Sequence, residues 1–203
     1  TTLLRQLLRQ YPMGEGGFRY GDTEVSQLGE QELQGLIGYV PQDHILFSRS
    51  VRENIAFGKD KATEEEILES VRIASFAEDL KNMSEGLETL VGEKGVSISG
   101  GQKQRISLAR ALIKDPEILM LDDSLSAVDA KTEQNIIANI KENRSGKTTI
   151  ISTHRLSAIK EADEIIVLDE GYIIERGTHN ELVSLQGWYY EQYMRQELKA
   201  GDE

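Results

Sequence analysis

The chain has 203 residues, of which 38% are hydrophobic and 29% charged, and this length suits one globular unit of two subdomains. It has no cysteine, which excludes disulfides, thiolate metal sites and cysteine nucleophiles, and its formal net charge of -12 argues against nucleic acid as a partner. No apolar run approaches the roughly 20 residues that a membrane helix needs.

The N-terminal region predicts a short helix followed by strands and turns. Apolar residues at helical spacing over 1–8 predict a helix that begins abruptly, and at its start Thr1 fits the role of a cap. Residues 11–29 hold five glycines between short polar and aromatic pieces, which indicates strands and turns, and 31–36 predict a short helix. Because the chain has no initiating methionine and no secretion signal, we expect it to be part of a longer protein.

A strand, a loop and a helical region come next. Residues 37–40 predict a strand that ends at a proline, so that Gln42 lies in a loop, where it is by itself an ordinary loop amide. From 61 to 83 the chain is mostly helical, and Thr63 with Glu66 three residues later forms a capping box. We expect this region to form a separate helical subdomain.

The segment 96–105 (VSISGGQKQR) runs without a break into a helical pattern and has the features of an anion site. The adjacent Gly100 and Gly101 let the backbone approach a ligand closely and take positive φ, and Ser99 offers a hydroxyl. The free N–H groups and the dipole of the following helix favour phosphate oxygens. A short glycine motif also fits an ordinary capped helix start, so the next segment decides between the two interpretations.

The segment 117–123 predicts a buried parallel strand that ends in two carboxylates. Its apolar run follows a proline and is closed by Asp122 and Asp123. In open α/β sheets the ligands bind at the carboxyl ends of the strands, so this acid pair stands where a metal-bound phosphate would lie. A loop at 124–129 and a helix at 131–140 follow.

The C-terminal part adds strands and a last helix. Residues 148–152 predict a strand whose end carries His154, at the same edge of the sheet as the acid pair. Lys147 and its neighbours imitate a phosphate-binding loop, but the glycine that this pattern requires is absent, so we reject the site. Residues 164–168 predict a last buried strand, which opens a hairpin, and 188–198 predict an amphipathic helix.

The Ser-Gly-Gly-Gln loop, its helix and the strand that ends in acids resemble the signature and Walker B motifs of the ATP-binding cassette (ABC) family. Residues 47–58 resemble its exporter branch, to which multidrug and lipid transporters belong. The resemblance implies an α/β fold like that of the P-loop NTPases, a mostly parallel sheet with a small antiparallel β part and a helical subdomain. It implies one nucleotide-binding domain over 1–203 that lacks its N-terminal strands and phosphate loop, with 1–42 and 115–203 as a RecA-like core and 43–114 as the helical subdomain.

The resemblance also implies ATP and Mg²⁺ as cofactors and assigns roles to residues. In this family, the position of Thr1 directly follows the phosphate loop, and the position of His154 contacts the γ-phosphate. The implied metal ligands are Thr1, Gln42 and Asp122. The implied catalytic residues are Asp123, His154 and Gln42, and the implied nucleotide-binding residues are Thr1, Thr2, Ser99, Gly100, Gly101, Gln102 and Asp129.

Asp123 departs from the family pattern, which usually has a glutamate as the catalytic base here. Aspartate is one methylene shorter, so its carboxylate falls short by roughly 1 Å, and such a misplacement costs on the order of 10²-fold in rate. We therefore expect a slow ATP site, as in the degenerate-site subunit of a heterodimeric exporter. Its expected partners are a second nucleotide-binding domain in a different chain, which receives the signature loop, and transmembrane domains at the cytoplasmic face of the cell membrane, with no nucleic acid.

Two other functions and another assembly stay open. A chromosome-maintenance-type ABC ATPase has similar motifs, but coiled-coil heptads are absent between residues 42 and 97. A chain without the phosphate loop would bind ATP weakly, so a non-catalytic interaction fragment is the second alternative. A homodimer would carry Asp123 in both of its ATP sites.

Overall fold

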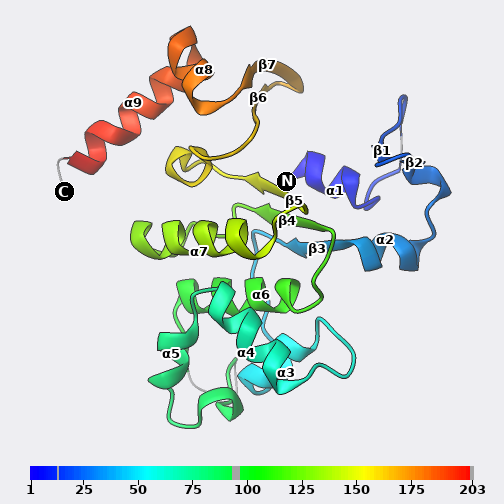
Figure 1. Cartoon of the computed structure of the whole chain (residues 1–203), viewed down its shortest axis with the longest axis vertical. Helices are drawn as coiled ribbons and strands as arrows, with labels where there is room; N and C mark the ends of the chain where they lie inside the picture. Colours follow the sequence, from blue (N-terminus) through cyan, green and yellow to red (C-terminus); the bar gives the residue numbers. More distant parts are fainter. Residues whose placement is uncertain (13, 93–96, 202–203) are drawn as a thin grey trace. The chain divides into compact units, whose positions relative to one another are not determined.

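Figure 1 shows the structure, a computed structural model that describes residues 1–12, 14–92 and 97–201. The chain forms two compact units, Thr1–Ser152 and Thr153–Glu203, and each is described by itself. The first unit contains a parallel sheet covered by helices, and the second contains a β-hairpin followed by two helices.

The centre of the first unit is a parallel sheet of three strands in the order β3-β4-β5. The strands are β3 (Ile37–Val40), β4 (Ile118–Asp122) and β5 (Thr148–Ser152), which confirms the three predicted strands. In the central strand, Leu121 is in register with Val40 of β3. The apolar run of β4 is buried because side chains pack on both faces of this sheet.

Two longer helices, α6 (Gly100–Leu112) and α7 (Ala130–Asn143), cover one face of the sheet (Figure 1). Successive side chains of a strand point to opposite faces, so Leu119 and Leu121 share a face. Both are fully buried and pack with apolar residues of α6 and α7 in the larger hydrophobic cluster. The loop that joins β4 to α7 starts at the carboxyl end of β4, and Ala127 in this loop contacts α6.

The opposite face of the sheet is covered by α1 (Thr2–Leu7) and α2 (Glu30–Leu36), the second of which confirms the helix expected near 31–36. Met120 of β4 points to this face and packs with Leu4 of α1. Asp122 comes two residues after Met120, so the alternation of β4 directs its side chain to the same face as α1.

The glycine-rich region between α1 and α2 forms a small antiparallel pair, β1 (Arg19–Tyr20) and β2 (Thr23–Glu24), and one turn of 3-10 helix, Val25–Gln27. Gly21 lies in the turn of the pair at a φ of 56°. Val25 is fully buried and packs in the same cluster as Met120. The expected strands and turns of this region are therefore confirmed.

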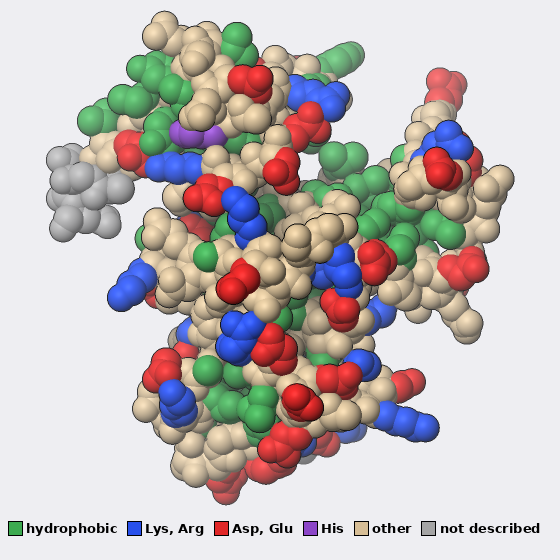
Figure 2. All heavy atoms as spheres, viewed as in Figure 1, with side chains coloured by type: hydrophobic (Ala, Val, Ile, Leu, Met, Phe, Trp, Pro, Cys, Tyr) green, Lys and Arg blue, Asp and Glu red, His purple; other side chains and the backbone are tan. Residues whose placement is uncertain are grey.

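A helical region lies between β3 and α6 in the sequence: α3 (Val51–Ala56), α4 (Glu64–Ile73) and α5 (Ala77–Lys81). Its apolar faces pack with α6, and the predicted capping box of Thr63 and Glu66 opens α4. The longest of the three helices has 10 residues, so the described part of this region forms no coiled coil. Figure 2 shows acidic side chains gathered over this end of the first unit.

The second unit consists of a hairpin, β6 (Ile165–Asp169) and β7 (Tyr172–Gly177), and two helices, α8 (His179–Leu185) and α9 (Trp188–Gly201). This confirms the predicted hairpin and C-terminal helix. Tyr189 is fully buried in the core of the unit. Each helix in the described part of the chain is too short or too polar to span a bilayer.

The prediction that the first strand of this hairpin is buried is correct for one face of it. Ile165 and Val167 are buried against the helices of the unit, whereas Ile166 and Leu168 are about half exposed. The reason is the alternation of side chains in a hairpin that packs on its helices with a single face.

Candidate functional site

Asp122 is a carboxylate at the carboxyl end of β4 with an exposed fraction of 1%. Its Oδ1 accepts a hydrogen bond from the hydroxyl of Thr1 at 3.0 Å, and its Oδ2 accepts one from the hydroxyl of Tyr39 at 3.0 Å. These donors are 121 and 83 residues away in the sequence. The structure thus joins two of the three expected metal ligands, Thr1 and Asp122, and adds a tyrosine.

Thr1 occupies the N-cap position of α1, but its side chain makes no capping hydrogen bond. The interpretation of this side chain as a helix cap is therefore wrong, because its hydroxyl donates to Asp122 instead. That contact agrees with the role that the family resemblance implies. Thr2, also expected at the nucleotide, is exposed as the first residue of α1.

Tyr39 is a residue of this site that sequence reasoning missed. Burial raises the pKa of its hydroxyl, and the hydrogen bond to Asp122 and the charge of Asp122 raise it further, while Arg5 has a weaker opposing effect. The hydroxyl is therefore protonated and donates to the carboxylate. Strand alternation would have found this residue, because Tyr39 is in register with Met120 and so shares the face of Asp122.

The oxygen atoms of Thr1 and Asp122 suit a magnesium ion. Mg²⁺ prefers oxygen ligands and is usually held by one or two protein groups, with phosphate oxygens and water in the other positions. Within the described residues, no group of three or more His, Cys, Asp or Glu side chains could hold a metal ion. An ion held by Thr1 and Asp122 would take its other ligands from a nucleotide and from water.

Gln42 and Asp123 follow the carboxyl ends of the neighbouring strands β3 and β4. Gln42 is exposed, and in the described part of the chain no hydrogen bond joins it to Asp122. Asp123 has a φ of 47°, a left-handed conformation that aspartate tolerates better than most residues. Its N–H donates to the carbonyl of Ser152 at 2.7 Å, and its carbonyl accepts from the hydroxyl of Ser126 at 3.1 Å. The backbone at the expected catalytic base is thus held from both sides.

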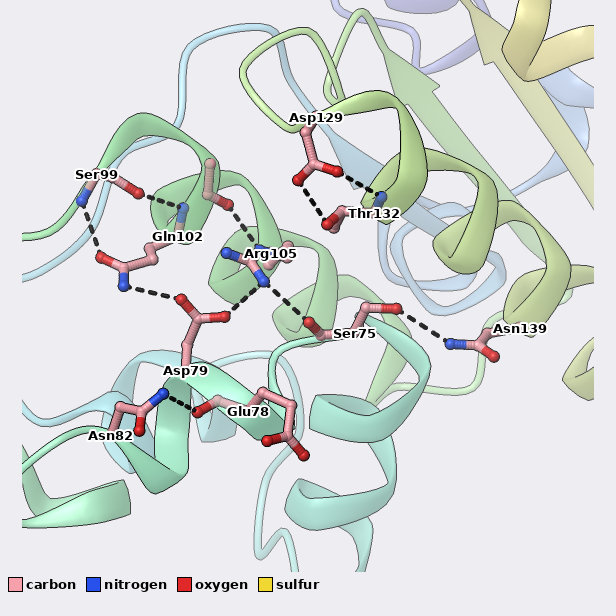
Figure 3. Close-up of polar contacts among 11 residues, drawn as sticks. Ser75, Glu78, Asp79, Asn82, Ser99, Gln102, Arg105, Asp129, Thr132 and Asn139 are labelled. Carbon is pink, nitrogen blue, oxygen red and sulfur yellow. Dashed lines mark hydrogen bonds and ion pairs between the residues drawn. The ribbon is translucent and has the colours of Figure 1, made fainter.

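Ser99 and Gln102 form a capping box at the start of α6 (Figure 3). The Oγ of Ser99 accepts the N–H of Gln102 at 3.2 Å, and the Oε1 of Gln102 accepts the N–H of Ser99 at 2.9 Å. The Ser-x-x-Gln spacing signals this box, but sequence reasoning did not use it here. The N–H groups of Gly100 and Gly101 lie between these two and have no acceptor within a helix.

The two glycines serve close packing rather than an unusual φ. The expectation of positive φ is wrong, since both lie in the first turn of α6 and neither is among the described residues with positive φ. A Cβ on Gly101 would lie 2.9 Å from the carbonyl oxygen of Ala127, and one on Gly100 would lie 3.3 Å from the Cβ of Ala127. The helix can approach the loop at 124–129 this closely because Gly101 has no side chain. Residues 93–96, which include the first residue of the predicted segment, lie outside the described residues.

Gln104 joins α6 to the loop at 124–129. It is buried, its Oε1 accepts the N–H of Ala127 at 2.9 Å, and its Nε2 donates to the Oγ of Ser126 at 3.2 Å. At the end of this loop Asp129 caps α7, and hydrogen bonds from the hydroxyl and the N–H of Thr132 lower the pKa of Asp129. Asp129, expected at the nucleotide, therefore has a structural role within this chain.

A second unforeseen contact links α5 to α6. The Oδ1 of Asp79 accepts from the Nε2 of Gln102 at 2.9 Å, and its Oδ2 accepts from the guanidinium of Arg105 at 2.6 Å (Figure 3). Arg105 also donates to the carbonyls of Ser75 and Gly101, at 2.9 and 3.2 Å. The start of α6 is therefore attached to the helical region by side chains as well as by the chain itself.

His154 belongs to the second unit, where Gln196 of α9 holds its turn. The Nε2 of Gln196 donates to the carbonyl of His154 at 2.8 Å, and its Oε1 accepts the N–H of Leu156 at 2.9 Å. The backbone at His154 is thus ordered by the C-terminal helix. The contact of its imidazole with a γ-phosphate stays a prediction.

The sheet, the acid at the end of β4 and the capped loop before α6 define a nucleotide-binding domain of the ABC type, and comparisons with known proteins agree. The profile of a family described as "ABC transporter" matches residues 1–126. The chain is 60% identical over 203 residues to "Probable multidrug resistance ABC transporter ATP-binding/permease protein YheI" of Bacillus subtilis, which covers all of this chain and 35% of that protein. It is 46% identical over 200 residues to "Multidrug resistance-like ATP-binding protein MdlA" of Escherichia coli, with 98% of this chain and 34% of that protein covered.

A solved structure is also similar, "Structure of a bacterial Atm1-family ABC exporter with ATP bound". The match has a TM-score of 0.92 and 38% identity, and it covers 97% of this chain and 35% of that one. The chain belongs to the ABC transporter family, which confirms the resemblance and the α/β fold class inferred from the motifs. It spans about a third of the length of these relatives.

Proposed function

We propose that this chain is the ATP-binding and ATP-hydrolysing domain of an exporter, which acts with transmembrane domains at the cytoplasmic face of the cell membrane. The contact between Thr1 and Asp122 carries the proposal, because it joins a hydroxyl and a buried carboxylate from distant segments at the ligand-binding edge of the sheet. Relatives described as multidrug resistance and ATP-binding proteins support the exporter branch.

Each residue of the site has a task in phosphoryl transfer to water. Thr1 and Asp122 would hold Mg²⁺, which when bound neutralises charge on the phosphates. Gln42 would orient the attacking water and Asp123 would accept its proton. His154 would donate to the γ-phosphate.

The signature loop would complete an ATP site on a second domain. Its residues are Ser99, Gly100, Gly101 and Gln102, at the start of a helix of 13 residues, whose dipole favours an anion. The capping box uses the N–H groups of Ser99 and Gln102 and leaves those of the two glycines for phosphate oxygens. Because Asp123 should make this chain's own site slow, the competent site would belong to a different chain.

The alternatives have less support. A chromosome-maintenance-type ATPase needs a coiled coil where this chain has the short helices α3, α4 and α5, over which acidic side chains gather (Figure 2). The net charge of -12 also opposes binding to nucleic acid. The pairing of a buried carboxylate with a hydroxyl 121 residues away suits a metal site, and this supports a catalytic domain over a non-catalytic fragment.

The test is photolabelling of the full-length protein with azido-ATP and Mg²⁺, with the label mapped to this domain. Asp122→Asn keeps the size of the side chain but removes its charge, so labelling should fall on the order of 10-fold or more. The matched control is Asp169→Asn, which changes an exposed aspartate that also ends a strand. Equal labelling of wild type and Asp122→Asn would contradict the metal site. An unlabelled wild type would favour the non-catalytic alternative.

A further inference from the structure

Asp79 is a carboxylate to which the proposed reaction gives no task. It lies in the first turn of α5, its side chain is 22% exposed, and its two oxygens accept hydrogen bonds from Gln102 and Arg105 (Figure 3). Glu78, the preceding residue of the same helix, is 80% exposed and pairs with Lys81. Asp79 is thus directed at the start of α6, whereas its acidic neighbour faces solvent.

The hydrogen bond from Gln102 to Asp79 selects one orientation of the glutamine amide. Its Oε1 accepts the N–H of Ser99 and its Nε2 donates to Asp79. If the amide were reversed, two donors would meet at Ser99 and two acceptors would meet at Asp79, so this state is excluded while the carboxylate is present. Asp79 therefore keeps the capping box closed, which means that the Oε1 of Gln102 stays on the N–H of Ser99.

Arg105 completes the arrangement by balancing charge. A carboxylate beside a helix start would repel a phosphate that binds there, but the guanidinium 2.6 Å from Asp79 neutralises it. Arg105 also donates to the carbonyl of Gly101, inside the signature loop, and to that of Ser75, just before α5. The pair therefore connects α5 to the loop without adding net charge at the anion site.

We propose that Asp79 is a positioning residue that holds the signature loop in its ATP-binding form, acting through Gln102 and Arg105. With the capping box closed, the N–H groups of Gly100 and Gly101 stay directed outward for the phosphates of a partner domain's ATP. The inference rests on the proposed function, since it concerns the affinity of that second site. If α5 moved, Asp79 would move with it and change the position of Gln102 and Arg105 beside the ATP of the partner domain.

The experiment compares steady-state ATP hydrolysis by the full-length protein assembled with its partner chain and by the same assembly with Asp79→Asn or Glu78→Gln. Asparagine cannot accept two charge-assisted hydrogen bonds, so the KM for ATP should rise roughly 3- to 10-fold while kcat changes less than 2-fold. Glu78→Gln removes the same charge one residue away and should leave both constants unchanged. Asp79→Glu keeps the charge and should raise KM less than Asp79→Asn does.

The outcomes separate this inference from the function on which it rests. An unchanged KM in Asp79→Asn, or an equal rise in Glu78→Gln, would refute the positioning role. A fall in kcat at constant KM would show that Asp79 only stabilises the helical region, and would also refute it. An assembled wild-type exporter without ATP hydrolysis would instead contradict the proposed function itself.

Discussion

The regions around Asp122 and around Ser99 are built in opposite ways. The partners of Asp122 come from 121 and 83 residues away, and they meet because β3 pairs with β4 and α1 packs on the face of the sheet to which Asp122 points. The partner of Ser99 is three residues away, and its capping box forms within the first turn of α6. The acid site therefore depends on the assembled sheet, whereas the signature loop begins with a local capping box that the tertiary contact with Asp79 then holds in place.

The two regions should also differ in what they control. Under the proposed function, Asp122 serves the slow ATP site of this chain, whereas Ser99 and its neighbours serve the competent site of a partner. Changes near Ser99 should therefore alter total hydrolysis, and changes near Asp122 should alter nucleotide labelling of this domain.

The largest effect is expected for Gly101→Ala, which places a methyl group in the contact between α6 and the loop at 124–129. The new Cβ would lie 2.9 Å from the carbonyl oxygen of Ala127, so backbone must move, and total ATP hydrolysis should fall about 10- to 100-fold. Gly35→Ala is the matched control, because Gly35 is also helical and has no atom within 4 Å of such a Cβ. Hydrolysis at the wild-type rate in Gly101→Ala would break the assignment of the signature region.

An intermediate effect is expected for Tyr39→Phe, which removes one of the two hydroxyl donors to Asp122. The Mg²⁺ concentration for half-maximal azido-ATP labelling of this domain should rise roughly 5-fold, because the buried carboxylate is held less firmly. Tyr20→Phe is the control, since the hydroxyl of Tyr20 donates to the carbonyl of Leu7 instead. An identical Mg²⁺ dependence in both variants would show that the hydroxyl of Tyr39 does not contribute to Mg²⁺ binding.

A smaller effect on total hydrolysis is expected at Asp123. Asp123→Asn should change the rate less than 2-fold, because the partner's site carries the flux, while Asp123→Glu should restore reach and raise hydrolysis at the weak site. Asparagine suits the φ of 47° about as well as aspartate does, so it is the milder backbone change. If Asp123→Asn removed nearly all activity, the asymmetric heterodimer would be wrong and a homodimer would be the better assembly.

The smallest effect is expected for Tyr20, whose ionisation at high pH should lower the free energy of unfolding. Burial raises the pKa of Tyr20 from its usual 10 to about 12. The folded state favours the neutral phenol. The contribution of Tyr20 to the free energy of unfolding is therefore complete below pH 10 and is lost as the pH rises toward 12. Phenolate absorbance that Tyr20→Phe removes should thus appear near pH 12, and its appearance near pH 10 would contradict the burial of this ring.

Local patterns of residues determine much of the secondary structure without any tertiary contact. The strands at 37–40 and 148–152 have the predicted bounds, and Thr63 and Glu66 form the predicted capping box. Such features depend on residues a few positions apart, so periodicity and capping rules are sufficient to find them. The acids at the end of β4, Asp122 in the strand and Asp123 after it, were predicted in the same way, from an apolar run that ends in charge.

The contacts between side chains that are distant in the sequence depend on the tertiary structure. The hydroxyl of Thr1 contacts Asp122 rather than capping α1. Position 101 is a glycine because Ala127 leaves no room for a Cβ there, and its φ is not positive. Asp79 reached Gln102 across 23 residues that no sequence pattern connects. The elements and their order follow from local spacing along the chain. The partners of each polar group depended on strand register and on the face that each side chain takes, which exist only once the sheet and its helices have packed.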